Sequence, residues 1–380
     1  MKVDQLESAD LKVNRDKTLD YLRGLAVFQV VFVHVFYYLF VLNIGSLTVL
    51  KSFALFEMPL FFFVTGAVNS LKDNGSYSSF IIKRFKGLLL PYYVYAAICL
   101  AISAIYCLLK NMLSVSLAIT VFLKWLFPLR GQIMPHVYFT WALWFIPVYL
   151  MITVMLPAAK VLVRKLGRLS VLIFVLVFIN VEVLLGILRT IPNKGSTLFS
   201  NILFIIQESF FYMIFVGLGL MYRQLKQRKS IDLILAAAML TAAVIGIVIC
   251  HFVFGNTLDM QTNKFPPNHV FMFYSFAVLS LLYLVLPFLK KIYKLLISII
   301  PVLDKLIVTF SENSIYVFLY QGFAFWIVNR LLAFLDMHNS LLEAAVAFAT
   351  IYPMVWLTVV IINRIRSFRK TDLKKQNVST

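Results

Sequence analysis

Charged residues are scarce in this sequence. Asp, Glu, Lys and Arg together make up 13% of its 380 residues, whereas hydrophobic residues make up 62%. Soluble domains are nearer to a quarter charged, so this composition excludes a soluble fold. It predicts a polytopic membrane protein instead.

Cysteine is also rare, and the sequence lacks several common motifs. Cys99, Cys107 and Cys250 all fall in apolar stretches, where cysteine commonly packs as a small hydrophobic residue. Their spacing fits neither a disulfide framework nor a zinc site, and we expect no metal. No phosphate-binding loop, dinucleotide-binding G-x-G-x-x-G or H-E-x-x-H motif is present, so ATP-driven transport, nicotinamide chemistry and zinc hydrolysis have no support.

Acidic residues are few: 16 Asp and Glu stand against 35 Lys and Arg, which gives a net charge of +19. Most of the basic residues occur in alternate connections between apolar stretches. This asymmetry is typical of the positive-inside rule, and it predicts that both termini are cytoplasmic. It also accounts for the net charge, so we expect no nucleic acid partner.

Ten apolar windows have the length needed to cross about 30 Å of hydrocarbon. They lie at 21–43, 50–70, 88–108, 139–157, 170–189, 201–221, 232–254, 268–289, 313–335 and 341–363. We therefore expect an all-α bundle of about ten transmembrane helices. It forms a single membrane-embedded domain over residues 1–380, with a cytoplasmic segment at 1–18 and a basic tail at 364–380 that can bind membrane lipids. A further stretch, 112–129, is interrupted by Lys124 and Pro128, and we expect it to be interfacial or re-entrant.

The first window carries ionisable residues at membrane depth. Residues 19–40, LDYLRGLAVFQVVFVHVFYYLF, contain Asp20, Arg23 and His34. On a helix the eleven residues from Arg23 to His34 advance about 16 Å in roughly three turns, so both side chains lie on one stripe. An ionisable residue inside a membrane is by default a functional candidate, because hydrocarbon offers it no partner. We expect this helix to line a site.

Several motifs resemble those of acyltransferase family 3, the integral-membrane O-acyltransferases of surface polysaccharides and related glycans. D-Y-L-R-G-L-A with a histidine eleven residues after the arginine is similar to the first helix of that family. Further similar segments are FEMPLFFFVTG at 56–66, KRFKGLLLPYY at 83–93, WALWFIPVYL at 141–150 and SENSIYVFLYQGF at 311–323.

The resemblance implies a donor, an acceptor and a location. The donor is a cytoplasmic acyl-CoA, with acetyl-CoA expected. The acceptor is a hydroxyl group of a surface polysaccharide or lipid-linked saccharide, modified at the plasma membrane by O-acetylation.

The resemblance also implies a donor site and a base. The phosphates of the donor would meet Arg23 and the basic cluster of Lys83, Arg84 and Lys86, although cytoplasmic basic residues are also ordinary topology markers. Gly87 stands where many family members have an arginine, so the basic residue that replaces it is left open. His34 would act as general base on the acceptor hydroxyl, since imidazole has the unperturbed pKa nearest to working pH.

Five residues form a second group of site candidates. Asp20 lies close to Arg23. Glu57 is either a proton acceptor or acceptor ligand, or a carboxylate that reaches the outer interface. Trp144 is either a site residue or an interface anchor. Tyr316 belongs to the 311–323 motif, as does Gln321, which stands where the family commonly has histidine.

The later helices carry polar pairs, and the loops between them are rich in Pro, Gly, Asn and Thr. Glu182 with Asn180, and Gln207 with Glu208, are expected to face the bundle interior, where hydrogen bonding between helices is the favoured interpretation. The outer loops at 189–200 and 255–268 are expected to be flexible rims of a vestibule. We also expect Ser311 to begin the ninth span and cap its first amides.

A transporter is the alternative function. The line of Asp20, Arg23, His34, Glu57, Glu182 and Glu208 would then be a pathway for a polysaccharide or a proton-coupled solute. Inverted repeats with paired broken helices are typical of transporters. The sequence has no convincing repeat, which favours the enzyme.

Overall fold

The computed structural model describes residues 16–35, 52–71, 76–110, 114–126, 139–190, 197–335 and 340–376. Within these ranges the chain is 88% helical and contains no strand. The all-α architecture expected from the sequence is therefore confirmed. The cytoplasmic location of the two termini stays a prediction.

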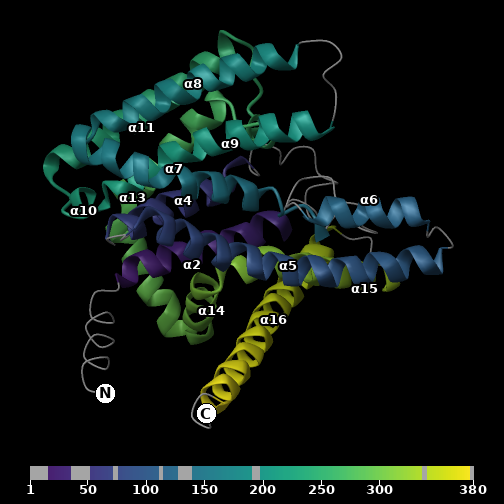
Figure 1. The fold of residues 1–380 in the computed structure, drawn as a ribbon. Coiled ribbons are helices and arrows are strands. Elements are labelled where there is room, and N and C mark those ends of the chain that lie inside the picture. Colours follow the sequence, from purple (N-terminus) through teal and green to yellow (C-terminus); the bar gives the residue numbers. More distant parts are fainter. Residues whose placement is uncertain are drawn as a thin grey trace.

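Figure 1 shows the helices of the described residues, coloured in chain order. They are α2 (Lys17–Val35), α4 (Glu57–Ser70), α5 (Tyr77–Leu109), α6 (Val115–Leu126), α7 (Phe145–Leu166), α8 (Leu169–Arg189), α9 (Thr197–Leu220), α10 (Tyr222–Leu225), α11 (Ser230–Phe252), α12 (Met260–Lys264), α13 (His269–Ile299), α14 (Pro301–Glu312), α15 (Ser314–Phe334) and α16 (Ser340–Gln376).

Nine helices of the described residues are long and apolar enough to cross a membrane. The window expected at 50–70 corresponds to α4, which has 14 residues and is too short to be counted with them. The window expected at 21–43 is described as far as Val35, and its remainder lies outside the described residues. The stretch at 112–129 forms the 12-residue helix α6, which is too short to span.

The helices divide into an interior set and a peripheral set. In the most apolar part of α9, 67% of the residues are buried, against 11% in α8 and 17% in α11. Figure 1 accordingly shows α8 and α11 together along one edge of the bundle. A helix that is apolar all round but little buried against protein fits contact with lipid, whereas α9 belongs to the core.

Two glycines bring α4 and α9 into close contact. A Cβ atom at Gly66 would lie 2.1 Å from the carbonyl oxygen of Val216, and one at Gly219 would lie 2.0 Å from the carbonyl oxygen of Phe63. Small residues at such positions let membrane helices approach closely, where van der Waals packing provides much of the association energy. This contact holds α4 at the centre of the bundle.

Three helix boundaries differ from the expectations. The basic residues of 83–86 lie on a helix rather than in a loop, because α5 already begins at Tyr77. Ser311 does not begin a helix: it lies in the last turn of α14, and the chain leaves helical geometry at Asn313, where φ is −122° and ψ is 29°. The tail expected at 364–380 continues α16 as far as Gln376, and Figure 1 shows the end of this helix extending away from the bundle.

Candidate active site

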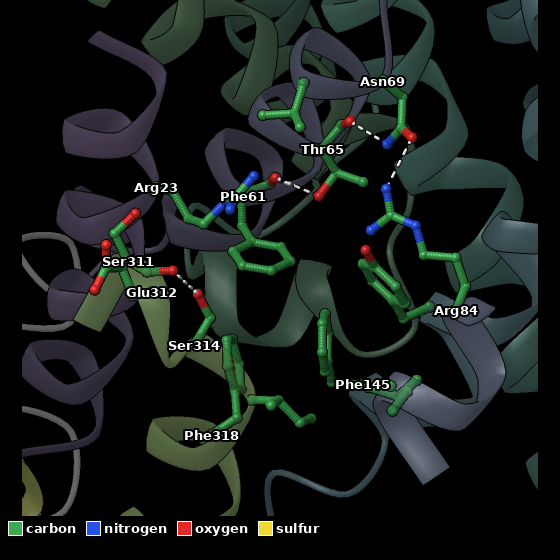
Figure 2. Close-up of a pocket in the computed structure, with 15 residues that line it drawn as sticks. Arg23, Phe61, Thr65, Asn69, Arg84, Phe145, Ser311, Glu312, Ser314 and Phe318 are labelled. Carbon is green, nitrogen blue, oxygen red and sulfur yellow. Dashed lines mark hydrogen bonds between the residues drawn. The ribbon is translucent and has the colours of Figure 1, made fainter. Parts of the chain in front are cut away.

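A pocket of about 230 Å³ lies among α2, α4, α5, α7, α14 and α15 (Figure 2). Its polar lining residues are Arg23, Thr65, Asn69, Arg84, Tyr149, Ser311, Glu312 and Ser314. Its apolar lining residues are Phe61, Val68, Gly87, Leu88, Phe145, Ile315 and Phe318. Two guanidinium groups thus share one pocket with an aromatic wall. Figure 2 shows Arg23 and Arg84 entering from different sides.

Arg84 is held in the pocket wall by α4. Its Nη2 atom donates a hydrogen bond of 3.0 Å to Oδ1 of Asn69, and its guanidinium carbon lies 5.5 Å from the centre of the Phe80 ring. Asn69 in turn donates to the carbonyl oxygen of Thr65 at 2.7 Å, and the Thr65 hydroxyl donates to that of Phe61 at 3.0 Å. The amide nitrogen of Asn69 is thus directed at Thr65, and its amide oxygen is directed at Arg84.

Asn69 was not identified from the sequence, although the sequence contains a signal for it. Phe61, Thr65 and Asn69 are spaced four residues apart, which places them on one face of α4. All three are buried, and all three line the pocket. An asparagine continuing such a stripe within an apolar helix is a candidate for a buried polar contact.

Arg23 reaches the pocket because α2 and α14 pack closely. A Cβ atom at Gly24 would lie 2.2 Å from the carbonyl oxygen of Ile307, so only glycine permits this approach. The contact brings the end of α14 to Arg23, where Ser311 and Glu312 complete the wall. Glu312 was not identified from the sequence, because its place beside Arg23 depends on this helix packing.

The expected basic cluster is divided. Arg84 lines the pocket, but Lys83 and Lys86 are exposed side chains that are not part of its lining. Gly87 does line the pocket, and a Cβ atom there would meet nothing within 4 Å. The space for a side chain at this position is therefore empty, and Arg84 is the basic residue of the cluster that contributes to the pocket.

His34 lies further along α2 and is not part of the pocket lining. Its Nδ1 atom lies 3.1 Å from Oε1 of Gln321, on α15. Its ring stacks on Trp141, with centroids 4.5 Å apart and planes 15° apart, and meets the Phe325 ring edge-on at 6.3 Å. The imidazole is thus held on one face by an indole and at one nitrogen by an amide. Gln321 is fully buried and takes that contact.

Glu57 forms a buried ion pair with Lys264, and both side chains are 4% exposed. The carboxylate is therefore not reaching for an interface. Lys264 comes from α12, in the connection that follows α11. The pair attaches this connection to the first residue of α4.

The connection at 255–268 is not the flexible rim that its composition suggested. The Ser52 hydroxyl donates to the carbonyl oxygen of Leu258 at 3.2 Å, and the Asn268 amide donates to Oδ1 of Asn263 at 2.8 Å. Asn263 is 3% exposed. Hydrogen bonds within the connection give it a compact turn. Its ion pair with Glu57 attaches that turn to α4.

The other second-group candidates lie away from the pocket lining. Asp20 is partly buried on α2. Trp144 is buried, with ring centroids 6.0 Å from Tyr212 and 5.4 Å from Phe265. The guanidinium carbon of Arg366, on α16, lies over the Tyr316 ring, 5.2 Å from its centre.

The polar residues of the later helices bind partners in different places. Glu182 accepts from His269 at 3.0 Å rather than from Asn180, whose exposed side chain donates to the Leu176 carbonyl oxygen in its own helix. The expectation that Asn180 faces the interior was wrong. Gln207 donates to the carbonyl oxygen of Pro267 at 2.7 Å, and Glu208 beside it is buried.

Comparison with known proteins identifies the family. A family model described as an acyltransferase domain, that of acyltransferase family 3, matches residues 16–362. No curated protein and no solved structure matches the chain. The match covers almost all of the described helices, including α2 with Arg23 and His34, and it confirms the resemblance seen in the motifs. The chain therefore belongs to acyltransferase family 3, and the protein is a multi-pass membrane acyltransferase.

Proposed function

We propose that this acyltransferase moves an acetyl group from cytoplasmic acetyl-CoA to a hydroxyl group of a cell-surface polysaccharide or lipid-linked saccharide, at the plasma membrane. The observation that carries the proposal is the arrangement on α2. Arg23 lines a pocket that it shares with Arg84, and His34 lies eleven residues further along the same helix. One helix thus offers an anion-binding group and a proton acceptor about 16 Å apart along its axis.

The two arginines suit an anionic donor. A guanidinium group forms charge-assisted, often bidentate, hydrogen bonds to phosphate oxygens. The pocket volume of about 230 Å³ is below the usual range for sites that enclose a drug-sized ligand. The pocket therefore fits one part of an acyl-CoA, with the remainder outside it.

His34 provides the proton transfer. In the proposed reaction, Nε2 of its ring takes the proton of the acceptor hydroxyl while the hydroxyl oxygen attacks the thioester carbonyl carbon. The carbon–sulfur bond then breaks, and the proton on the ring passes to the thiolate, which leaves as CoA thiol. The ring is neutral again at the end of the cycle. General acid–base catalysis of this kind contributes typically about 10²- to 10⁴-fold to the rate.

The test compares surface glycans from cells that carry the wild-type protein, no protein, His34→Gln or His251→Gln. His251 is the matched control, since its ring nitrogen contacts the backbone oxygen of Asn256 at 2.8 Å, in the turn that follows α11. Mass spectrometry should find acetyl groups with the wild-type and His251→Gln proteins, and none with His34→Gln. Purified His34→Gln should still bind acetyl-CoA, which shows that it is folded.

Two results would contradict the proposal. Acetylation by His34→Gln at close to the wild-type rate would remove the base from the mechanism. Loss of the entire glycan from the surface of cells without the protein, rather than loss of its acetyl groups, would indicate an exporter.

A further inference from the structure

Three phenylalanine rings from three helices meet at one wall of the pocket. Phe145 and Phe318 stack with centroids 4.5 Å apart and planes 10° apart. Phe61 meets Phe145 edge-on at 5.4 Å and Phe318 edge-on at 5.6 Å. All three rings are buried and line the pocket, and Figure 2 shows them grouped there.

Two chain segments place Phe318 and Phe145 on the side of the pocket toward His34. On α15, Phe318 lines the pocket, and Gln321, one turn later, contacts His34. At the start of α7 the order is reversed: Phe145 lines the pocket, and Trp141, four residues earlier in the turn that precedes the helix, stacks on His34. On α2, the pocket residue Arg23 is likewise separated from His34 along the helix.

The packing of the rings restricts what can pass. Interiors of proteins are close-packed, so a mutually contacting set of rings leaves no channel unless the side chains turn. A donor whose phosphates lie at the arginines must place its acyl carbonyl on the far side of these rings in order to reach His34. A short acyl chain requires a smaller displacement of the rings than a long acyl chain.

We infer that Phe61, Phe145 and Phe318 form a barrier that sets the acyl-chain length of the donor, admitting short chains and excluding long ones. The inference rests on the proposed function, because it assigns a selectivity to the same donor site. In an apolar pocket one methylene group discriminates typically about 10- to 200-fold. Replacing a barrier ring with leucine removes part of that restriction.

The test measures equilibrium binding of CoA, acetyl-CoA, butyryl-CoA and hexanoyl-CoA to purified protein in detergent. The variants are Phe145→Leu and Phe318→Leu, studied separately. Phe211→Leu is the matched control, since that ring is equally buried but packs against Phe178 and Phe271, away from the pocket. The wild-type and control proteins should bind acetyl-CoA at least about 10-fold more tightly than hexanoyl-CoA. Either barrier variant should reduce this ratio by about 10-fold, because CoA and both acyl-CoA donors share any change in the rest of the site.

The outcomes separate the two proposals. Equal affinity of the wild-type protein for acetyl-CoA and hexanoyl-CoA overturns the barrier without any variant, as does an unchanged ratio in a barrier variant that still binds CoA. Failure of the wild-type protein to bind CoA or any acyl-CoA contradicts the proposed function instead.

Discussion

The Nδ1 atom of His34 lies 3.1 Å from Oε1 of Gln321, and this contact determines which nitrogen of the neutral ring carries the hydrogen. The amide nitrogen of Gln321 donates to the carbonyl oxygen of Phe318 at 3.2 Å, and a carbonyl oxygen can only accept. The amide oxygen must therefore face the imidazole, and Nδ1 carries the hydrogen. In the neutral ring the lone pair is then on Nε2, which is the atom that a general base uses.

We predict that Gln321→Met lowers acyl transfer about 2- to 12-fold without weakening acetyl-CoA binding, because it removes one hydrogen bond worth about 0.5–1.5 kcal/mol. Gln29→Met is the control on α2, since the Gln29 side chain donates to the carbonyl oxygen of Ala54. The nitrogen chemical shifts of the His34 ring should show a mixture of tautomers in Gln321→Met alone. An unchanged rate and spectrum would mean that another group sets the tautomer.

Arg84 and Lys86 lie on the same helix and differ in their position relative to the pocket. We predict that Arg84→Met weakens equilibrium binding of acetyl-CoA about 10- to 150-fold, because a hydrogen bond to a charged group contributes about 1.5–3 kcal/mol. Lys86→Met should have less than about a 5-fold effect, since an exposed charge contributes under about 1 kcal/mol. Equal losses in the two variants would indicate that the donor responds to the overall positive charge and not to the pocket.

The close contact of α4 with α9 predicts a strong effect of one methyl group. Gly66→Ala places a Cβ atom 2.1 Å from a backbone oxygen, which cannot move aside as a flexible side chain can. We expect a loss of about 1–3 kcal/mol in stability, seen as a lower thermal unfolding midpoint in detergent. Gly186→Ala is the control, since nothing lies within 4 Å of its Cβ position. Equal midpoints for both variants would show that the helices separate at no cost.

A carboxylate outside the spanning helices predicts a dependence of stability on pH. Asp16 accepts hydrogen bonds from Lys226 at 2.6 Å and from the Tyr222 hydroxyl at 3.0 Å. Partial burial raises the pKa of the Asp16 carboxyl, but these two donors and the Lys226 charge outweigh burial and lower that pKa below its ordinary value of 3.8. The ionised carboxylate therefore stabilises the folded state above this ordinary value, and the contribution is lost as the pH falls through the folded-state pKa.

We accordingly predict that Asp16→Asn lowers the thermal unfolding midpoint at neutral pH and that the difference from wild type shrinks as the pH falls below 3.8. The effect should be under about 1 kcal/mol, because the Lys226 side chain is 60% exposed and solvent screens the pair. Melting curves across this pH range provide the measurement. A difference of constant size would assign the effect to lost hydrogen bonding alone.

The sequence by itself determined the class of protein and the content of its first helix. Apolar length and scarcity of charge are local properties, and nine of the ten windows that they indicated correspond to long apolar helices of the described residues. The shared stripe of Arg23 and His34 is equally local, because helical periodicity alone relates the two positions. These features also carried the resemblance to the family.

Only the tertiary structure decided which residues work together. The rotation of α5 against α4 places Arg84 in the pocket and leaves Lys83 and Lys86 outside it. Glu57 pairs with Lys264 across 207 positions, and His34 meets Gln321 across 287 positions. No local periodicity relates such distant positions, because helix packing selects these partners, and it depends on close contacts such as those at Gly24 and Gly66.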